Sequence, residues 1–252
     1  MNAETSGPNT LAIDIGGTGL KASVLDAAGT MLVDRARTPT TYPMPPEKLV
    51  ETLSRLAASL PRFDRVSAGF PGMVRAGRVL TAPHFVTKDG PGTEVAPALA
   101  EAWAGFDLAA ALAAALGQPA KVVNDADMQG AAVVEGNGLE LVVTLGTGVG
   151  TGLFYEGRLC PHLELAHHPL RKDQTYNQRL GEVARKQVGN KKWNKRVADA
   201  VEVLHSLFNF DHLFIGGGNA SKLTFELPAN ASLVDNAAGI LGGIKLWDRE
   251  AL

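Results

Sequence analysis

The segment LAIDIGGTGLK, from Leu11 to Lys21, limits the possible folds more than any other part of the chain. Its apolar start predicts a short buried strand, and its two glycines predict a tight turn. Residues 19 to 25 continue as extended sequence, so no helix follows the turn, and the segment matches neither the dinucleotide-binding fingerprint nor the P-loop. Two interpretations stay open: an ordinary β-hairpin with glycines in its turn, and a hairpin whose backbone binds phosphate.

The phosphate-binding interpretation gives each polar residue of this hairpin a role. Gly16 and Gly17 would let the backbone approach an anion closely. Thr18 would add a hydroxyl donor, and Lys21 would add a positive charge. The carboxylate of Asp14 repels phosphate, so its presence is best explained as a ligand of Mg²⁺, which prefers oxygen ligands and bridges to phosphate.

Composition excludes several classes of protein. The 252 residues are 45% hydrophobic, which suits one large domain or two small lobes with a sizeable core. A formal net charge of -2 gives no overall attraction to nucleic acid or to acidic membranes, and we expect neither as a partner. The single cysteine, Cys160, excludes an internal disulfide framework. The N-terminus is polar and no apolar run reaches transmembrane length, so we expect a cytoplasmic protein.

Hydrophobic periodicity predicts alternating strands and helices, as in α/β folds. In the first half we expect strands over residues 10–15, 19–25, 30–38, 65–70 and 120–124, and helices over residues 46–60 and 106–116. In the second half we expect strands on both sides of residues 146–150, a strand from residue 212 into a GGG turn, and helices over residues 197–208 and 237–252.

Residues 81–95, TAPHFVTKDGPGTEV, show no period and resemble a loop that could lie over a site. His84, Lys88 and Asp89 of this loop could contact a substrate, although exposed loop polarity is the simpler interpretation.

Asn124 and Asp125 lie where a predicted strand ends and a helix begins. Ligands bind at the carboxyl ends of strands in open α/β sheets, so this polar pair is a candidate site. Helix capping is the alternative, because either side chain could accept hydrogen bonds from the first amides of the helix.

Two further glycine turns follow predicted strands. Residues 146–150 form a Gly/Thr turn between two apolar segments, which repeats the logic of the first hairpin. The segment HLFIGGGNASK, residues 212–222, enters a third turn that contains Gly217. Three glycine turns at strand ends indicate that the chain binds a nucleotide or a polyphosphate, because such turns present backbone amides to phosphate.

The segments DIGGTGLK, GFPGMV, VVNDAD, TLGTGVGTG, ELAHH and FIGGGN, in this order, resemble the sugar kinases of the ROK family. The resemblance implies an α/β, actin-like ATPase (ribonuclease H-like) fold, with two lobes and a central cleft. The lobes would comprise residues 1–125 with a C-terminal helix at about 237–252, and residues 126–236. Members of this family are commonly homodimers.

The resemblance also assigns roles to residues. Asp125 would be the catalytic base, and the sugar would be bound by Asn124, Glu164, His167 and Gly72. The phosphate chain would lie against Gly16, Gly17, Thr18, Lys21, Gly146, Thr147, Gly148 and Gly217, with Mg²⁺ at Asp14.

Several features depart from the family pattern. Ala166 stands where the family usually has glycine, and a sugar-contacting asparagine is not evident in residues 81–103. The cysteine-rich zinc loop of many members is absent, so we expect no structural zinc, although the run of histidines from His162 to His168 leaves a metal site as a minor alternative.

Residues 169–197 replace the zinc loop and hold nine of the 24 Lys and Arg residues. Such a run is normally a solvated helical face. The zinc-free branch of the family resembles polyphosphate glucokinases, and a long polyanion needs an extended basic track. We therefore hypothesise that a track is formed by Arg171, Lys172, Arg185, Lys186, Lys191, Lys192, Lys195 and Arg196.

The resemblance implies a kinase that phosphorylates the 6-hydroxyl of glucose with inorganic polyphosphate, and with ATP as a possible second donor. An ATP-dependent kinase for another hexose or an amino sugar is one alternative. A non-catalytic sugar-binding regulator is the other, although only about nine residues precede the first predicted strand, too few for a helix-turn-helix domain.

Overall fold

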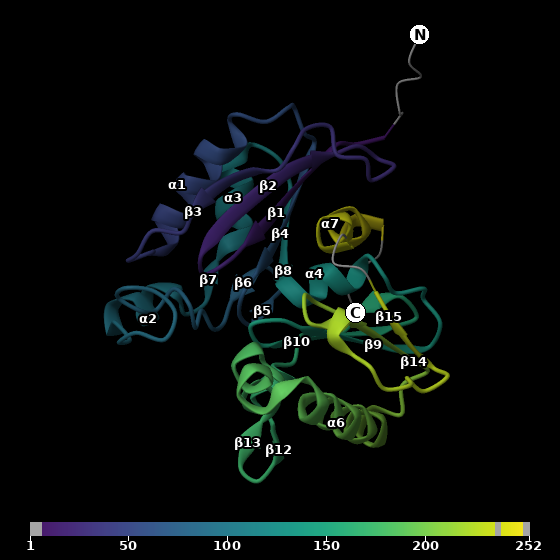
Figure 1. The fold of residues 1–252 in the computed structure, drawn as a ribbon. Helices are drawn as coiled ribbons and strands as arrows, with labels where there is room; N and C mark the ends of the chain where they lie inside the picture. The colour runs from purple at the N-terminus through teal and green to yellow at the C-terminus, as the bar shows by residue number, and fades with distance from the viewer. Residues whose placement is uncertain (1–6, 235–237, 249–252) are drawn as a thin grey trace. The chain divides into compact units, whose positions relative to one another are not determined.

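Each of the two units into which the chain divides is built around one five-stranded sheet (Figure 1). The computed structural model describes residues 7–234 and 238–248. The N-terminal residues 1–6, and residues 237 and 249–252 of the expected closing helix, lie outside this described part.

The boundary between the units falls after the helix that follows Asn124. Unit 1 comprises Met1–Ala132 with Gly239–Asp248, and unit 2 continues over Val133–Ala238. The division of lobes after residue 125 stays a prediction.

The sheet of unit 1 has the strand order β3-β2-β1-β4-β8. Its strands are β1 (Thr10–Ile15), β2 (Gly19–Leu25), β3 (Ala36–Pro39), β4 (Arg65–Phe70) and β8 (Ala120–Asn124). β1 pairs antiparallel with β2 and parallel with β4, and β4 pairs parallel with β8. Four of the five strands predicted in this half are confirmed, and the carboxyl ends of β1, β4 and β8 share one edge of the sheet.

The predicted strand over residues 30–38 is wrong in its first part, since only β3 continues the sheet there. The Asp26 carboxylate accepts hydrogen bonds from the amides of Ala28 at 2.9 Å and Thr30 at 2.8 Å, which turns the chain after β2. The side chains of residues 31–33 are exposed. Their apolar character therefore does not reflect burial in the core.

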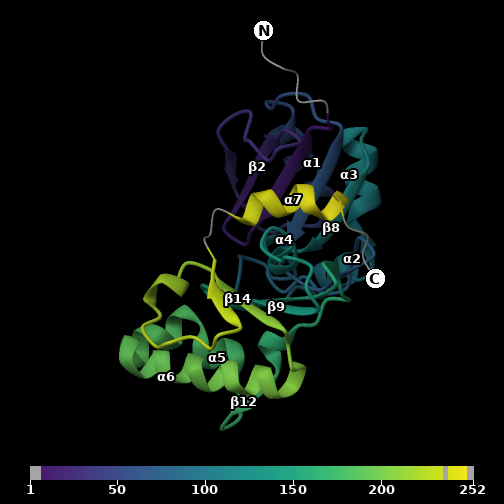
Figure 2. The ribbon, with the colours of Figure 1, turned by 90° about the vertical axis from the view of Figure 1, so that its right-hand side faces the viewer.

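Helices cover both faces of this sheet (Figure 2). α1 (Pro46–Ala57) and α3 (Leu108–Leu116) pack on the face where Leu11, Ile13 and Ile15 point. The predicted helix over residues 46–60 is thus three residues shorter, and the helix expected from residue 106 begins at Leu108, where Asp107 caps it by accepting a bond from Ala110.

α7 (Ala238–Asp248) lies on the opposite face, which it shares with α4 (Asp125–Ala131). The hydroxyl of Ser67 on β4 donates a hydrogen bond to the Gly243 carbonyl at 2.6 Å and accepts one from Trp247 Nε1 at 2.8 Å. A side chain at Gly243 would place its Cβ 3.1 Å from the Cβ of Ala12. Small residues on both sides therefore let α7 lie close to the sheet.

An aromatic cluster in unit 1 anchors the segment over residues 81–95. Phe85 is 0% exposed, and its ring centroid lies 5.4 Å from that of Phe70 and 5.6 Å from that of Trp103. Trp103 ends α2 (Pro97–Trp103), a helix that we had not predicted, and its indole N–H donates to the Met44 carbonyl at 3.0 Å. The expected loop is thus partly packed into the core.

Unit 1 also contains a small sheet of three short strands, β5 (Val74–Arg75), β6 (Arg78–Val79) and β7 (Phe106–Asp107).

The sheet of unit 2 has the strand order β11-β10-β9-β14-β15. Its strands are β9 (Leu139–Leu145), β10 (Val149–Tyr155), β11 (Arg158–Leu159), β14 (His212–Gly216) and β15 (Ala231–Leu233). β9 pairs antiparallel with β10 and parallel with β14. The predicted strands around residues 146–150 and from residue 212 are confirmed.

The basic run folds into a hairpin and two helices. The hairpin is β12 (Pro169–Arg171) with β13 (Gln174–Thr175), and it leads to α5 (Tyr176–Leu180) and α6 (Glu182–Phe208). α6 contains the helix predicted over residues 197–208 but begins 15 residues earlier, and it is kinked at Gly189, where φ is 74° and ψ is 158°.

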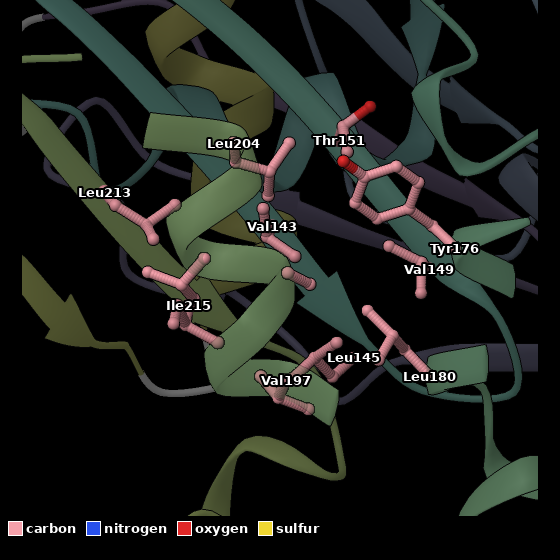
Figure 3. A pocket seen from close by; sticks show the side chains of 12 residues that line it. Val143, Leu145, Val149, Thr151, Tyr176, Leu180, Val197, Leu204, Leu213 and Ile215 are labelled. Atoms are coloured by element: carbon pink, nitrogen blue, oxygen red, sulfur yellow. The ribbon is translucent and has the colours of Figure 1, made fainter. Parts of the chain in front are cut away.

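α6 closes the core of unit 2 by placing Trp193, Val197 and Leu204 against the sheet. A small cavity of about 10 Å³ remains between α6, α5 and the strands (Figure 3). Its lining is apolar except for Thr151 and Tyr176. The buried Tyr176 hydroxyl has no hydrogen-bond partner among the described residues, and burial raises the pKa of Tyr176.

None of the helices in the described ranges has the length and hydropathy needed to cross a membrane.

Glu182, the first residue of α6, binds two cations of the basic run. Its carboxylate accepts hydrogen bonds from Arg185 Nε and Nη2, both at 2.9 Å, and Lys186 Nζ lies 3.3 Å away. The hydrogen bond from Arg185 is the largest cause of a low pKa, with smaller contributions from Asn219 and Lys186. Together they outweigh partial burial and lower the pKa of Glu182 from 4.5 to about 2.

We expect Phe85→Ala to lower the free energy of unfolding by about 3 to 5 kcal/mol, because it removes a fully buried ring from the aromatic cluster. Chemical denaturation would measure this change. Val95→Ala is the matched control, since Val95 belongs to the same segment and is 53% exposed. Equal effects of the two substitutions would show that the segment is not anchored through Phe85.

We expect Glu182→Gln to make the free energy of unfolding depend less on pH in the acid range. In the folded protein this carboxylate stays charged down to about pH 2, whereas the unfolded chain binds a proton near pH 4.5. The stability that Glu182 contributes is present above pH 4.5 and is lost as the pH falls towards 2. Denaturation from pH 5 to 2 should show a smaller slope in Glu182→Gln and in Arg185→Gln, and an unchanged slope in both variants would contradict this assignment.

Candidate active site

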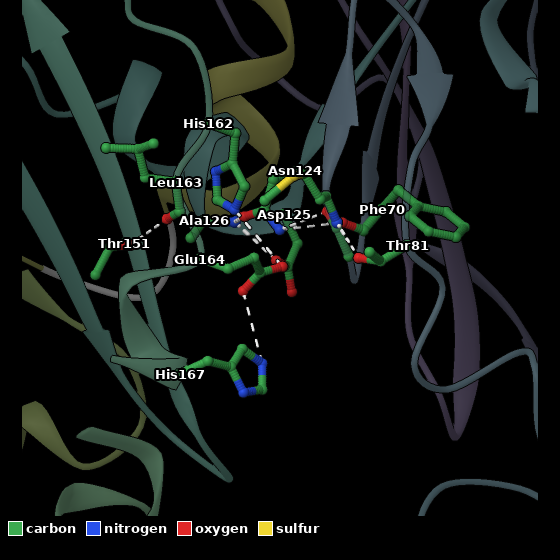
Figure 4. Close-up of polar contacts among 12 residues, drawn as sticks. Phe70, Thr81, Asn124, Asp125, Ala126, Thr151, His162, Leu163, Glu164 and His167 are labelled. Atoms are coloured by element: carbon green, nitrogen blue, oxygen red, sulfur yellow. Dashed lines mark hydrogen bonds and ion pairs between the residues drawn. The ribbon is translucent and has the colours of Figure 1, made fainter. Parts of the chain in front are cut away.

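Asp125 is placed by the side chain before it. Asn124 is buried, and its Nδ2 donates to the Gly72 carbonyl at 3.0 Å and to the Phe70 carbonyl at 3.4 Å (Figure 4). Its Oδ1 accepts a hydrogen bond from the Ala126 amide at 2.8 Å and so caps α4. Asp125 is therefore the first residue of α4, at the carboxyl end of β8, where the positive end of the helix dipole stabilises a carboxylate.

The capping interpretation is confirmed for Asn124, whose amide also holds the turn after β4. Gly72 lies in that turn, and a side chain there would collide with the Thr81 carbonyl. Asp125 is half-buried, and its Oδ1 also accepts from the Ala126 amide, at 2.9 Å. Contacts of Asn124 and Gly72 with a sugar stay predictions.

The first glycine turn joins β1 to β2. The Gly16 amide donates to the Gly19 carbonyl at 3.1 Å, which closes the turn. Thr18 at its tip is exposed. Two hydroxyls hold the turn from outside: Thr40 Oγ1 donates to the Gly16 carbonyl and Tyr42 Oη to the Gly17 carbonyl, both at 2.7 Å.

Gly17 also contacts the segment over residues 81–95. A Cβ at this position would lie 2.9 Å from Pro91 Cγ and 3.2 Å from His84 Cγ, so only glycine fits without movement. Tyr42 and His84 are therefore further functional candidates. Sequence reasoning missed Tyr42, and it favoured His84 as an exposed polar residue of a loop. Burial raises the pKa of Tyr42, which keeps its hydroxyl protonated as a donor.

Asp14 and Lys21 face each other across β1 and β2, with Lys21 Nζ 2.8 Å from Asp14 Oδ2. Both side chains are partly exposed. Proteins usually bind Mg²⁺ through one or two carboxylates, with waters and substrate phosphates as the other ligands. A single carboxylate beside a glycine turn fits this donor set.

The sheet register sets the spacing of the acids in unit 1. Asp14 lies opposite Gly69 on β4, and Gly69 lies opposite Val123 on β8. The backbone at Asp14 is thus two strands from Val123, roughly 10 Å. Asp125 follows two residues later, so this sheet edge carries both Asp14 and the candidate base.

The second and third glycine turns meet in unit 2. The Gly146 amide donates to the Gly148 carbonyl at 2.9 Å, and Thr147 lies between them. Gly217 has φ of +88°, and a side chain there would collide with Leu145. Asn219, two residues later, donates from Nδ2 to the Gly146 carbonyl at 3.1 Å. The structure therefore brings together the predicted phosphate-contacting residues of this unit.

Asn177 and Asn219 support these turns but were missed in the sequence. Asn177 Oδ1 accepts a hydrogen bond from the Val149 amide at 2.6 Å. No local signal could have revealed this contact, because Asn177 lies 28 residues after Val149.

Glu164 lies between two histidines in unit 2. Its Oε1 is 3.7 Å from Nε2 of the buried His162, and its Oε2 is 3.9 Å from Nε2 of the exposed His167 (Figure 4). Ala166, at the position where the family usually has glycine, is buried in the core. The Thr151 hydroxyl donates to the Leu163 carbonyl at 3.1 Å and fixes the backbone just before Glu164.

The side chains of Glu164 and His167 therefore lie close together, as their spacing predicted. Their contact with adjacent hydroxyl groups of a sugar stays a prediction. Within the described ranges, no group of three or more His, Cys, Asp or Glu side chains could hold a metal ion.

Comparisons with known proteins show which sequences and structures this chain is similar to. Polyphosphate glucokinase of Mycobacterium tuberculosis is 27% identical, covering 95% of this chain and 93% of that protein. The structure of the inorganic polyphosphate/ATP-glucomannokinase of Arthrobacter sp. strain KM superimposes with a TM-score of 0.76 and 28% identity, covering 94% of this chain and 97% of that one.

A structure of lower identity supports the fold. The ROK family glucokinase of Streptomyces griseus, solved with glucose and AMPPNP, is 19% identical and superimposes with a TM-score of 0.68, covering 94% of this chain and 98% of that one. The predicted fold class, the two-lobed actin-like ATPase fold, is confirmed by these likenesses. The ROK family profile matches residues 10–166, more than half of the chain, and the protein therefore belongs to the ROK family.

Proposed function

We propose that this protein is a kinase that transfers a phosphoryl group from inorganic polyphosphate, and also from ATP, to the 6-hydroxyl of glucose. The observation that carries the proposal is the Asp125 carboxylate at the N-terminus of α4, on the same sheet edge as the first glycine turn and Asp14. The Mycobacterium tuberculosis and Arthrobacter relatives, whose names specify polyphosphate, support the choice of donor.

Asp125 would act as the general base. A sugar hydroxyl is a weak nucleophile, so a carboxylate within hydrogen-bond reach accepts its proton as the oxygen bonds to phosphorus. The bond between the transferred phosphorus and the bridging oxygen breaks, and the shortened donor leaves. The buried amide of Asn124 fixes the backbone from which Asp125 projects.

The glycine turns would bind the donor through backbone amides, since phosphoryl transfer depends mainly on positioning and charge stabilisation. Lys21 would add a positive charge. Asp14 would hold Mg²⁺, which neutralises charge on the donor phosphates when bound. Gly16, Gly17, Thr18, Gly146, Thr147, Gly148 and Gly217 are the proposed phosphate-contacting residues.

Glu164, His167, Asn124 and Gly72 are the residues proposed to bind the sugar. With one cysteine and therefore no internal disulfide, the chain suits a reducing compartment, and we place it in the cytoplasm. We also propose that it forms a homodimer, as members of its family commonly do.

An ATP-dependent kinase for an amino sugar is the second candidate. The N-acetylmannosamine kinase of Escherichia coli is 34% identical over 154 residues, which cover 60% of this chain. Purified protein with Mg²⁺ should be assayed with glucose and with N-acetylmannosamine, each with long-chain polyphosphate and with ATP. Turnover of N-acetylmannosamine alone would favour this candidate over the first.

We expect Asp125→Asn to lower kcat for glucose phosphorylation about 10²- to 10⁴-fold with either donor, because the general base is lost. Coupled detection of glucose 6-phosphate would measure the rate, and calorimetry would show retained glucose binding. Asp34→Asn, which neutralises an exposed carboxylate of unit 1, is the control. Retained turnover in Asp125→Asn would contradict the assignment, and absence of turnover in the unchanged protein would favour a sugar-binding regulator.

We expect Glu164→Gln to raise KM for glucose roughly 10- to 100-fold, because a hydrogen bond to a charged group contributes about 1.5 to 3 kcal/mol. The KM for the phosphoryl donor should change little. Glu226→Gln, an exposed site in the same unit, is the control. A change confined to the donor KM would remove Glu164 from the sugar site.

A further inference from the structure

Three arginines of unit 2 converge from three elements of the basic run. Arg171 ends β12, Arg179 lies on α5, and Arg196 lies on α6. Arg196 Nη1 donates to the Arg179 carbonyl at 3.3 Å, and Arg171 Nη1 lies 3.6 Å from Asp199 Oδ2. Arg171 lies opposite Gln174 in the hairpin, and the Gln174 side chain accepts a hydrogen bond from Arg179. Burial lowers the pKa of Arg179, and the positive charges of Arg196 and Arg171 lower it further.

Arg179 lies at the centre of this arginine cluster, and of the three arginines it is the one whose burial costs the most free energy. It is only 8% exposed, and its Nε has no hydrogen-bond partner among the described residues. Its Nη1 donates to Gln174 Oε1 at 3.3 Å. Burying a cation beside two others costs free energy unless an anion compensates, and Asp199 supplies one negative charge for three positive ones.

A purely structural role explains only part of these contacts. Arg179 connects α5 to β13 through Gln174, and Arg196 connects α6 to the end of α5. Each of these bonds uses one donor of a guanidinium group that has five. The remaining donors, together with the excess positive charge, match the oxygens of an anion.

The arginine cluster is connected to the second glycine turn by short segments of rigid backbone. α5, which carries Arg179, also carries Asn177, whose side chain binds the Val149 amide at the end of that turn. The Glu182 amide, at the junction of α5 and α6, donates to the carbonyls of Gly146 at 3.1 Å and Thr147 at 3.2 Å. Arg179 lies between Asn177 and Glu182 in sequence, so these contacts hold it at a fixed distance from the second glycine turn.

Two further pairs of cations in the basic run differ in their surroundings. Arg185 and Lys186 bind Glu182 and are committed to that carboxylate. Lys192 and Lys195 are exposed on α6. Lys192 lies one turn before Arg196 and Lys195 one turn before Asp199, on the same side of the helix. The arginine cluster therefore adds Arg179 to the residues hypothesised from sequence, and it does not depend on Arg185 or Lys186. The remainder of the hypothesised track stays a prediction.

We propose that Arg171, Arg179 and Arg196 form a second anion site, which binds the part of a polyphosphate chain that extends beyond the phosphates at the second glycine turn. This inference rests on the proposed function, because it assigns the site to the donor of that reaction. The site makes affinity depend on chain length: a long chain reaches both the turn and the cluster, whereas tripolyphosphate and ATP reach only the turn.

Polyphosphate fits this site better than single-stranded nucleic acid. Binding of nucleic acid without sequence preference combines a basic groove with exposed aromatic side chains on which bases stack. The aromatic residues of the hairpin, α5 and the first half of α6 are Tyr176 and Trp193, and both are buried in the core. The site offers positive charge and hydrogen-bond donors. Each unit of a polyphosphate chain carries the negative charge and the acceptor oxygens that match them.

The test compares Arg171→Gln/Arg196→Gln with Arg55→Gln/Arg158→Gln, a control that removes the same charge from exposed positions elsewhere. Anisotropy of labelled long-chain polyphosphate, at several salt concentrations, measures binding without turnover. We expect Kd to rise about tenfold or more in the first variant, and the salt dependence of log Kd to fall by about 1 to 2. Binding of tripolyphosphate, KM for ATP, and the control variant should not change.

Three results would overturn the proposal: equal losses for long-chain polyphosphate and tripolyphosphate, an equal loss in the control variant, or equally tight and equally arginine-dependent binding of RNA. Arg171→Gln alone, at a side chain that is 65% exposed, keeps the test valid if the double variant folds poorly. Glucose phosphorylation is measured separately. Normal turnover with unaltered binding in the variant overturns the second site alone, whereas arginine-dependent binding without turnover overturns the proposed function.

Discussion

The buried amide of Asn124 is the contact on which the geometry of unit 1 depends. One side chain satisfies an amide at the start of α4 and a carbonyl in the turn after β4, so the end of β8 and that turn cannot move independently. Removing it would take this donor from the buried Gly72 carbonyl, at a cost of about 1 to 3 kcal/mol, and would leave the Ala126 amide with the Asp125 carboxylate as its acceptor. The position of Asp125 is therefore a consequence of core packing, and the same contact explains why a polar residue is tolerated there.

The glycine turns need external support because glycine itself is flexible. In unit 1 this support comes from Thr40 and Tyr42, whose hydroxyls bind the turn carbonyls, and from the segment over residues 81–95, which Phe85 anchors in the core. In unit 2 it comes from Asn177 and Asn219. Both turns are thus fixed by side chains distant in sequence, so that their conformation is set before any anion binds.

Local patterns were sufficient to predict the longer strands of both sheets, the glycine turns and the Asn124–Asp125 pair, because each depends on neighbouring residues. Short strands such as β11 and β15 were not predicted. The exposed apolar run 31–33 misled the strand prediction, since periodicity does not report which face has a partner. α2 and the packing of Phe85 were missed because Pro and Gly dominate the local signal around them. Supporting residues such as Tyr42 and Asn177 act through contacts that single-sequence reasoning cannot supply.

The basic run shows why composition alone cannot define an anion site. Lys and Arg residues carry equal charge but differ in how many of their hydrogen-bond donors remain available to an anion. Glu182 accepts two hydrogen bonds from Arg185, and its lowered pKa means that this carboxylate stays charged, and the ion pair intact, at physiological pH. Asp199, by contrast, lies 3.6 Å from Arg171, and among the described residues it is the carboxylate that offsets the positive charge around the buried Arg179. The unbalanced charge is therefore concentrated where the hairpin, α5 and α6 meet. A net charge of -2 for the whole chain conceals this local excess.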